Sequence, residues 1–153
     1  MKIKKLLICL AIPLAVGGLS ALLSGGMDSY DGLVKPPLSP PGWLFPVVWT
    51  ILFLLMGYAS YRVLTANAPQ DQRRKALFAY GAQLVLNFLW SPVFFGLGWL
   101  TAAFFILVAL WIMIVVTTAL FGRMDTIAGN LLLPYLLWVT FAGYLNFAFI
   151  LLN

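Results

Sequence analysis

Residues 76–122 read ALFAYGAQLVLNFLWSPVFFGLGWLTAAFFILVALWIMIVVTTALFG and contain no charged side chain. A membrane-spanning helix needs about 20 mainly apolar residues, so this run is too long for one span and about the right length for two. The natural break is Gly96-Leu97-Gly98, because glycine ends helices at little conformational cost. The run therefore predicts two spanning helices joined by a tight connection.

The composition of the whole chain is also that of a membrane protein. Charged residues make up 8% of the 153 positions and hydrophobic residues 63%, whereas a soluble domain has about 25% charged residues. The sequence predicts an all-α integral membrane protein, a bundle of five transmembrane helices that forms a single domain over residues 1–153. We expect the helices at about 6–25, 43–65, 77–96, 99–121 and 127–150, with a loop at 26–42.

The first apolar run begins like a secretory signal peptide, because Met1-Lys2-Ile3-Lys4-Lys5 precedes it. Its apolar part is as long as a membrane span and lacks an Ala-x-Ala cleavage site, which favours a retained helix. The lone cysteine, Cys9, falls in this run and is interpreted as a small apolar residue of the helix.

The basic residues predict the orientation of the bundle. Five spans place the N-terminus and loops 62–76 and 122–126 on one side of the membrane, together with all but one of the nine Lys and Arg residues. Only Lys35 lies on the other side. Because cytoplasmic loops are rich in Lys and Arg, we expect a cytoplasmic N-terminus, a C-terminus on the opposite side and an outer loop 26–42. The net charge of +5 therefore needs no nucleic-acid partner.

Several kinds of chemistry lack the side chains they require. The chain has one Cys, no His and four acidic residues, all of them Asp near predicted span ends. Zinc sites, disulfide frameworks and histidine base catalysis have too few of their usual groups, so we expect no metal site and no required cofactor. Ion pumps and proton-coupled transporters usually keep ionisable residues inside the membrane, and the middles of the predicted spans carry none.

Polar and aromatic side chains share one face on three of the predicted spans. Gln83, Asn87 and Ser91 recur every four residues and so lie on one helix face. Such a stripe faces protein or a cavity, and it fits either interhelical hydrogen bonding or ligand binding. Comparable faces carry Trp49, Phe53, Met56 and Ser60 on the second span, and Tyr135, Trp138, Ala142 and Asn146 on the fifth.

These faces are expected to meet at one depth in the outer half of the membrane. At 1.5 Å per residue, Trp49 lies roughly 9 Å inward from Trp43, and Asn87 lies roughly 14 Å inward from the end of its span. Trp138 and Ala142 fall at a similar depth. Aromatic and amide groups at matching depth on three helices are typical of a pocket.

Prolines within the spans are a further sign of local irregularity. Pro13, Pro46, Pro92 and Pro134 each lack a backbone donor. Pro92 is expected to loosen the carbonyl near Phe88, one turn from Asn87. Kinks of this kind can open space between helices.

The residues assembled above resemble the TspO/MBR family, which comprises the tryptophan-rich sensory proteins of bacteria and the mitochondrial translocator protein, or peripheral benzodiazepine receptor. The resemblance runs from about Tyr30 to Asn146. It rests on Tyr30-Asp31, Leu33, Lys35-Pro36, Pro40-Pro41, Phe45-Pro46 and Trp49, then on Gln83, Asn87, Trp90 and Pro92-Val93-Phe94-Phe95, and finally on Pro134-Tyr135, Trp138 and Leu145-Asn146.

The resemblance implies a homodimer of five-helix bundles in a bacterial membrane, either inner or outer, with a pocket beneath the first outer loop. Ligands of the family are porphyrins such as protoporphyrin IX and haem, sterols in some members, and synthetic isoquinolines or benzodiazepines. The pocket positions that carry over are Tyr30, Pro40, Trp49, Phe53, Asn87, Trp90, Phe94, Trp138 and Ala142.

Three functions fit this resemblance to different degrees. The first is a membrane receptor, sensor or transporter that binds tetrapyrroles in an aromatic pocket. The alternative is light- and oxygen-dependent porphyrin breakdown, in which Trp49 and Trp138 would be redox partners. The third is a structural or partner-binding membrane subunit without a small-molecule ligand.

The chain also departs from the family pattern. Ser29 precedes Tyr30 where the family often has tryptophan, and Phe147 stands where the sterol motif of animal members has tyrosine, with no basic residue after it. The proline-rich stretch 35–49, KPPLSPPGWLFPVVW, could be a polyproline ligand, but its outer location favours a stiff lid over the pocket.

Overall fold

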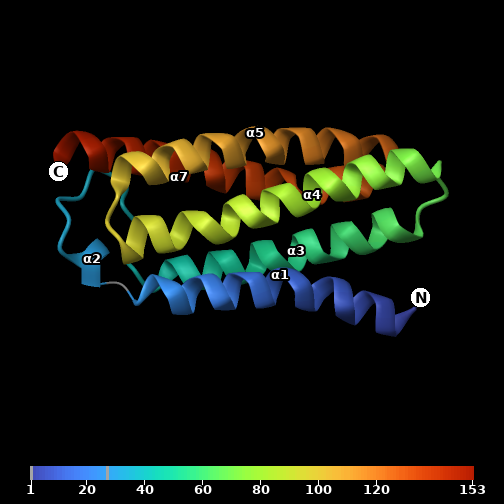
Figure 1. Ribbon diagram of the computed structural model, residues 1–153, viewed down its shortest axis with the longest axis horizontal. Helices are drawn as coiled ribbons and strands as arrows, with labels where there is room; N and C mark the ends of the chain where they lie inside the picture. Colours follow the sequence, from blue (N-terminus) through green and yellow to red (C-terminus); the bar gives the residue numbers. More distant parts are fainter. Residues whose placement is uncertain (1, 27) are drawn as a thin grey trace.

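Within the part of the chain that the structure describes, five helices are long and apolar enough to cross a membrane, and their axes run roughly side by side (Figure 1). The computed structural model describes residues 2–26 and 28–153. The spans are α1 (Ile3–Ser24), α3 (Leu44–Thr65), α4 (Gln70–Ser91) continued by the π-helical η1 (Pro92–Gly96), α5 (Leu100–Met124), and α6 (Thr126–Leu131) followed by α7 (Leu133–Leu152). The predicted all-α membrane fold with five spans is confirmed.

The chain termini lie at opposite ends of the bundle, as an odd number of spans requires (Figure 1). The short helix α2 (Asp28–Asp31) lies at the same end as the C-terminus, and we call this end the α2 end. The predicted break between α4 and α5 is confirmed, because η1 ends at Gly96 and Gly98 has a φ of 67°. The cytoplasmic location of the N-terminus stays a prediction.

The third span begins earlier than the apolar pattern predicts, at Gln70 instead of residue 77. Residues 70–75 are good helix formers, and Pro69 directly before them has a φ of −58°, which is suited to a helix start. Arg73 then donates from Nε to the carbonyl of Val63 at 3.2 Å, at the end of α3. Hydropathy marks the part of a helix that lies in lipid, whereas propensity and capping decide where the helix begins.

The other boundaries lie close to expectation, with one division inside the fifth span. Asp125 caps α6 by accepting hydrogen bonds from the backbone N–H groups of Ile127 at 2.9 Å and Ala128 at 3.4 Å. It also pairs with Nε of Arg62 at 2.9 Å, which ties the end of α3 to the start of α6. The break between α6 and α7 falls at Leu132, just before Pro134.

Helix α1 is held against α3 at the end opposite α2. A Cβ atom built on Gly57 of α3 would lie 2.7 Å from the carbonyl oxygen of Cys9, so only glycine permits this approach. Pro13 lacks the N–H that would otherwise bond the Cys9 carbonyl within α1. The two helices therefore cross closely at this point.

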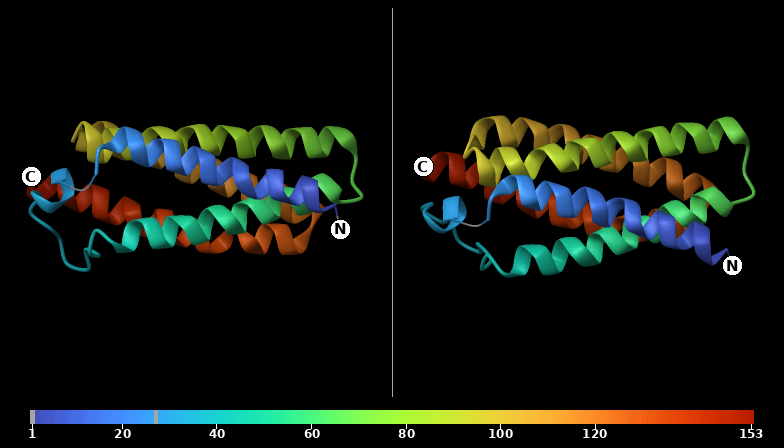
Figure 2. Two further views of the ribbon diagram at one scale, coloured as in Figure 1. Left: turned by 90° about the horizontal axis from the view of Figure 1, so that it is seen from below. Right: turned by 60° about the horizontal axis from the view of Figure 1, so that its bottom comes forward.

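Near the α2 end, α1 is held against α4 instead. Ser20 Oγ donates to the carbonyl of Phe88 at 2.9 Å, the carbonyl that Pro92 leaves without a helical donor. The hydroxyl groups of Ser24 and Ser91 lie 2.8 Å apart. As a result, α1 lies close to α3 near its N-terminus and diverges from it toward the α2 end (Figure 2).

The crossing of α1 and α3 predicts a specific sensitivity at Gly57. Gly57→Ala should lower the free energy of unfolding by about 1–3 kcal/mol through overpacking, which lowers the unfolding midpoint by roughly 2–4 °C per kcal/mol. Thermal unfolding in mild detergent measures this. Gly81→Ala is the control, because a Cβ there meets no atom within 4 Å, and an unchanged midpoint for Gly57→Ala would contradict the close crossing.

Candidate functional site

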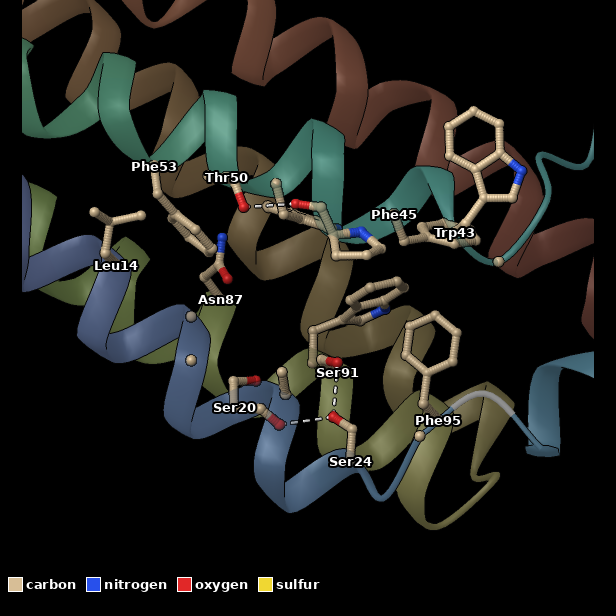
Figure 3. Close-up of a pocket in the computed structure, with 18 residues that line it drawn as sticks. Leu14, Ser20, Ser24, Trp43, Phe45, Thr50, Phe53, Asn87, Ser91 and Phe95 are labelled. Atoms are coloured by element: carbon tan, nitrogen blue, oxygen red, sulfur yellow. Dashed lines mark hydrogen bonds between the residues drawn. The ribbon is translucent and has the colours of Figure 1, made fainter.

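A cavity of about 490 Å³ lies between α1, α3 and α4 at the α2 end of the bundle. Helix α1 contributes small side chains, α3 contributes aromatic rings, and α4 contributes an amide, an indole and a hydroxyl (Figure 3). The lining residues are Leu14, Gly17, Gly18, Ser20, Ala21, Ser24, Gly26, Gly42, Trp43, Phe45, Pro46, Trp49, Thr50, Phe53, Asn87, Trp90, Ser91 and Phe95. The cavity is a direct result of the divergence of α1 from α3.

Aromatic rings form the floor and one wall of this cavity. The floor is Phe53, whose ring lies so close to α1 that a Cβ built on Gly17 would be 2.1 Å from it. Trp49 stacks on Phe53 with ring centroids 5.6 Å apart and an interplanar angle of 28°. Trp90 packs beside Trp49, with ring centroids 6.4 Å apart.

Trp90 is fixed in place by a hydrogen-bonded chain that links three helices. Its Nε1 donates to Oδ1 of Asn146 on α7 at 3.1 Å, and Nδ2 of Asn146 donates to the carbonyl of Leu100 on α5 at 2.9 Å. Both side chains are buried. A pre-positioned indole offers its aromatic face to a ligand with little ordering cost.

The predicted polar stripe on α4 makes hydrogen bonds between helices. Nδ2 of Asn87 donates to the hydroxyl of Tyr135 at 2.7 Å, and that hydroxyl donates to Oε1 of Gln83 at 2.7 Å. Ser91 pairs with Ser24 of α1. Interhelical bonding therefore accounts for the stripe, and Asn87 and Ser91 line the cavity as well.

Seven of the nine predicted site residues fall into two groups in space. Trp49, Phe53, Asn87 and Trp90 line the cavity. Tyr30, Phe94 and Ala142 surround a separate void of only about 10 Å³, because Phe45, Phe95 and Phe149 also pack there. Trp138 lies behind the cavity wall, with its ring centroid 6.5 Å from that of Trp49. The carbonyl of Pro40 accepts a hydrogen bond from the Tyr30 hydroxyl at 2.5 Å.

The proline-rich loop is fastened to the α7 side of the bundle. Tyr144 donates from its hydroxyl to the carbonyl of Pro37 at 2.7 Å, and the side chain of Asn153 bonds both the N–H and the carbonyl of Val34, at 3.0 and 3.1 Å. The segment before α3 thus covers the aromatic cluster around Tyr30 and borders the cavity at Gly42 and Trp43. The side chain of Ser29, the predicted departure from the family, lies outside the described residues.

Tyr30 is the centre of the aromatic cluster beneath this loop. Its side chain is 1% exposed and packs against Phe45, Phe95 and Phe149, with centroids 5.2, 5.9 and 5.6 Å away. Burial raises the pKa of its hydroxyl above the ordinary value. The hydroxyl therefore stays protonated at neutral pH and keeps its donor function toward Pro40.

Sequence reasoning missed the contribution of α1. Gly17, Ser20 and Ser24 all line the cavity, and their spacing of i, i+3 and i+7 places them on one helix face. In the sequence, the signal for this contribution was a helix face of small and polar residues in an otherwise apolar span. Among the side chains that the structure describes, no three metal-ligating groups gather to form an ion site.

Comparison of the sequence with known proteins identifies the family of this chain. Residues 9–152 match the model of the TspO/MBR family. The chain belongs to the TspO/MBR family. It is 42% identical to the tryptophan-rich protein TspO of Chlorobaculum tepidum over 99% of this chain and 98% of that protein.

Other members of the TspO/MBR family are similar over most of their length. The tryptophan-rich sensory protein of Cereibacter sphaeroides is 43% identical over 81% of this chain and 76% of its own. The translocator protein of Sus scrofa is 34% identical over 89% of this chain and 82% of its own. Family membership and five apolar helices establish an integral multi-pass membrane protein and support a sensor or receptor role.

The hydrogen-bonded network of α4 and α7 predicts the effect of removing one hydroxyl. Tyr135→Phe leaves Gln83 and Asn87 without their partner and should destabilise the protein by about 1–2 kcal/mol. Tyr144→Phe is the control, because its hydroxyl bonds an exposed loop carbonyl and its loss should change stability by less than about 0.5 kcal/mol. Chemical unfolding in detergent compares the two variants, and equal effects would contradict the importance of the buried network.

Proposed function

We propose that the protein binds tetrapyrroles such as protoporphyrin IX or haem in the cavity between α1, α3 and α4, as a membrane sensor, receptor or transporter. The observation that carries the proposal is the pair of tryptophan faces, Trp49 and Trp90, that bound a cavity of about 490 Å³. Pockets for small molecules have volumes of roughly 300–1,000 Å³ and mostly apolar walls.

The chemistry of the walls suits a flat conjugated ring. Trp49, Phe53 and Trp90 offer aromatic faces, which stack on other aromatic systems with about 0.5–1.5 kcal/mol per pair beyond area burial. On the opposite side, Gly18 and Ala21 leave room next to the backbone of α1, whereas the ring of Phe53 fills the space beside Gly17. A thin and wide ligand fits between these surfaces better than a bulky globular one.

Polar groups in the cavity are few and fixed in position. Thr50, Ser24 and Ser91 already use their hydroxyl groups in hydrogen bonds to protein, whereas Asn87 commits its Nδ2 to Tyr135. The amide oxygen of Asn87 is thus the group best placed to orient a ligand, for example by accepting a bond from a pyrrole N–H. Isoquinolines and other flat apolar compounds suit the same walls.

Titration with protoporphyrin IX tests the proposal. Trp49→Leu should weaken binding at least about tenfold, because the loss of one stacking face removes about 1.5 kcal/mol. Trp111→Leu is the matched control, because Trp111 lies away from the cavity and bonds Thr140 on α7. The absorbance change of the porphyrin measures affinity without depending on the number of tryptophans.

Two results would contradict the assignment. If Trp49→Leu bound protoporphyrin as tightly as the unmodified protein, the ligand would occupy another place. If the unmodified protein showed no saturable binding, the protein would not be a tetrapyrrole receptor at all.

A further inference from the structure

The cavity has an open side between α1 and α3. The residues along its two edges are exposed, namely Gly18 and Ala21 on α1 and Pro46 and Thr50 on α3. We call these four residues the slot. In a bundle that crosses a membrane, the surface around these helices is in contact with lipid, so the slot faces the bilayer and not water.

The slot extends from the membrane surface into the hydrocarbon. Trp43 at the start of α3 is 68% exposed and lines the end of the cavity, which is the usual place of an interfacial tryptophan. Thr50 lies roughly 10 Å further along the helix at 1.5 Å per residue. The open side thus spans most of the thickness of the hydrocarbon region of one leaflet.

Among the lining residues that the structure describes, none is Asp, Glu, Lys or Arg. The nearest basic residue of the loop, Lys35, donates from Nζ to the carbonyls of Asp31 at 3.2 Å and Leu33 at 3.5 Å and lies over the ring of Tyr30. An ionised carboxylate inside the cavity would therefore lack a charged partner among the described residues and would be disfavoured there.

From these observations we propose that the ligand enters through the slot from the bilayer and binds edge-on, with its apolar ring in the cavity and its carboxylates at the level of the lipid headgroups. This inference rests on the proposed function and specifies its ligand class as membrane-dissolved amphiphiles. Water solvates the carboxylates at that level, as it does the charged ends of snorkelling side chains. No protein cation is required.

Gly18 provides a direct test of the slot. A Cβ on Gly18 meets no atom within 4 Å, so Gly18→Phe places a ring at the edge of the slot without disturbing the packing of α1. Gly81→Phe is the matched control, because Gly81 is also an exposed helical glycine with open space around it and does not line the cavity. Both substitutions replace glycine within a helix and should not destabilise it.

The experiment mixes vesicles that contain the protein with vesicles preloaded with protoporphyrin IX and follows the quenching of tryptophan fluorescence. Gly18→Phe should slow association and weaken binding, each at least about tenfold, while Gly81→Phe stays within about twofold of the unmodified protein. Unchanged association and affinity in Gly18→Phe would overturn the inference. If that variant behaves normally while Trp49→Leu loses affinity, the cavity assignment stands and only the lateral route fails.

The position of the carboxylates is tested with the dimethyl ester of protoporphyrin IX in the same vesicles. When ligand concentrations are expressed per lipid, the affinity of the ester should lie within about threefold of that of the free acid. A threefold change in affinity corresponds to less than one neutral hydrogen bond. Lys35→Gln should leave both affinities unchanged. A loss of tenfold or more for the ester, or for the acid in Lys35→Gln, would place the carboxylates against the protein and overturn the edge-on mode.

Discussion

The position of α1 near the α2 end depends first on one backbone carbonyl, that of Phe88. Pro92 deprives this carbonyl of its helical donor, and a bilayer offers no water to replace it. Ser20 of α1 supplies the missing donor at 2.9 Å, and Ser24 adds a second link to Ser91. At the other end of α1, Gly57 has no side chain, so the backbone of α3 can contact the Cys9 carbonyl of α1. Helix α1 is therefore fixed to α3 at one end and to α4 at the other, and it must diverge from α3 in between.

This divergence explains why the cavity lies where it does. The space between α1 and α3 is bounded by Trp49 and Phe53 on one side and by small residues on the other, while α4 closes the back with Trp90 and Asn87. The links from α4 to α7 through Tyr135 and Asn146 keep this back wall rigid. The same arrangement leaves one side open to lipid. The proposed ligand chemistry and the proposed route of access thus follow from one structural cause.

Much of this arrangement could be predicted from the sequence. Hydropathy located all five spans, and the Gly96-Leu97-Gly98 break separated α4 from α5 as expected, because those signals are local. The role of α1 could not be obtained in this way. The hydroxyl of Ser20 meets the carbonyl of Phe88 across 68 residues of chain, and no local pattern specifies that pairing. Depth matching grouped Trp138 with Trp49, and their ring centroids lie 6.5 Å apart, whereas Ala142 lies beside the separate small void around Tyr30.

The distance between the ends of α1 and α3 tests this account most directly. Spin labels at Leu22 on α1 and Val47 on α3, which are 78% and 49% exposed, report the separation in lipid nanodiscs when Cys9 is replaced by alanine. The account predicts one narrow distance distribution that broadens toward shorter distances in Ser20→Ala/Ser24→Ala, because α1 is then released from α4. An identical narrow distribution in that variant would contradict the claim that these two serines hold the cavity open.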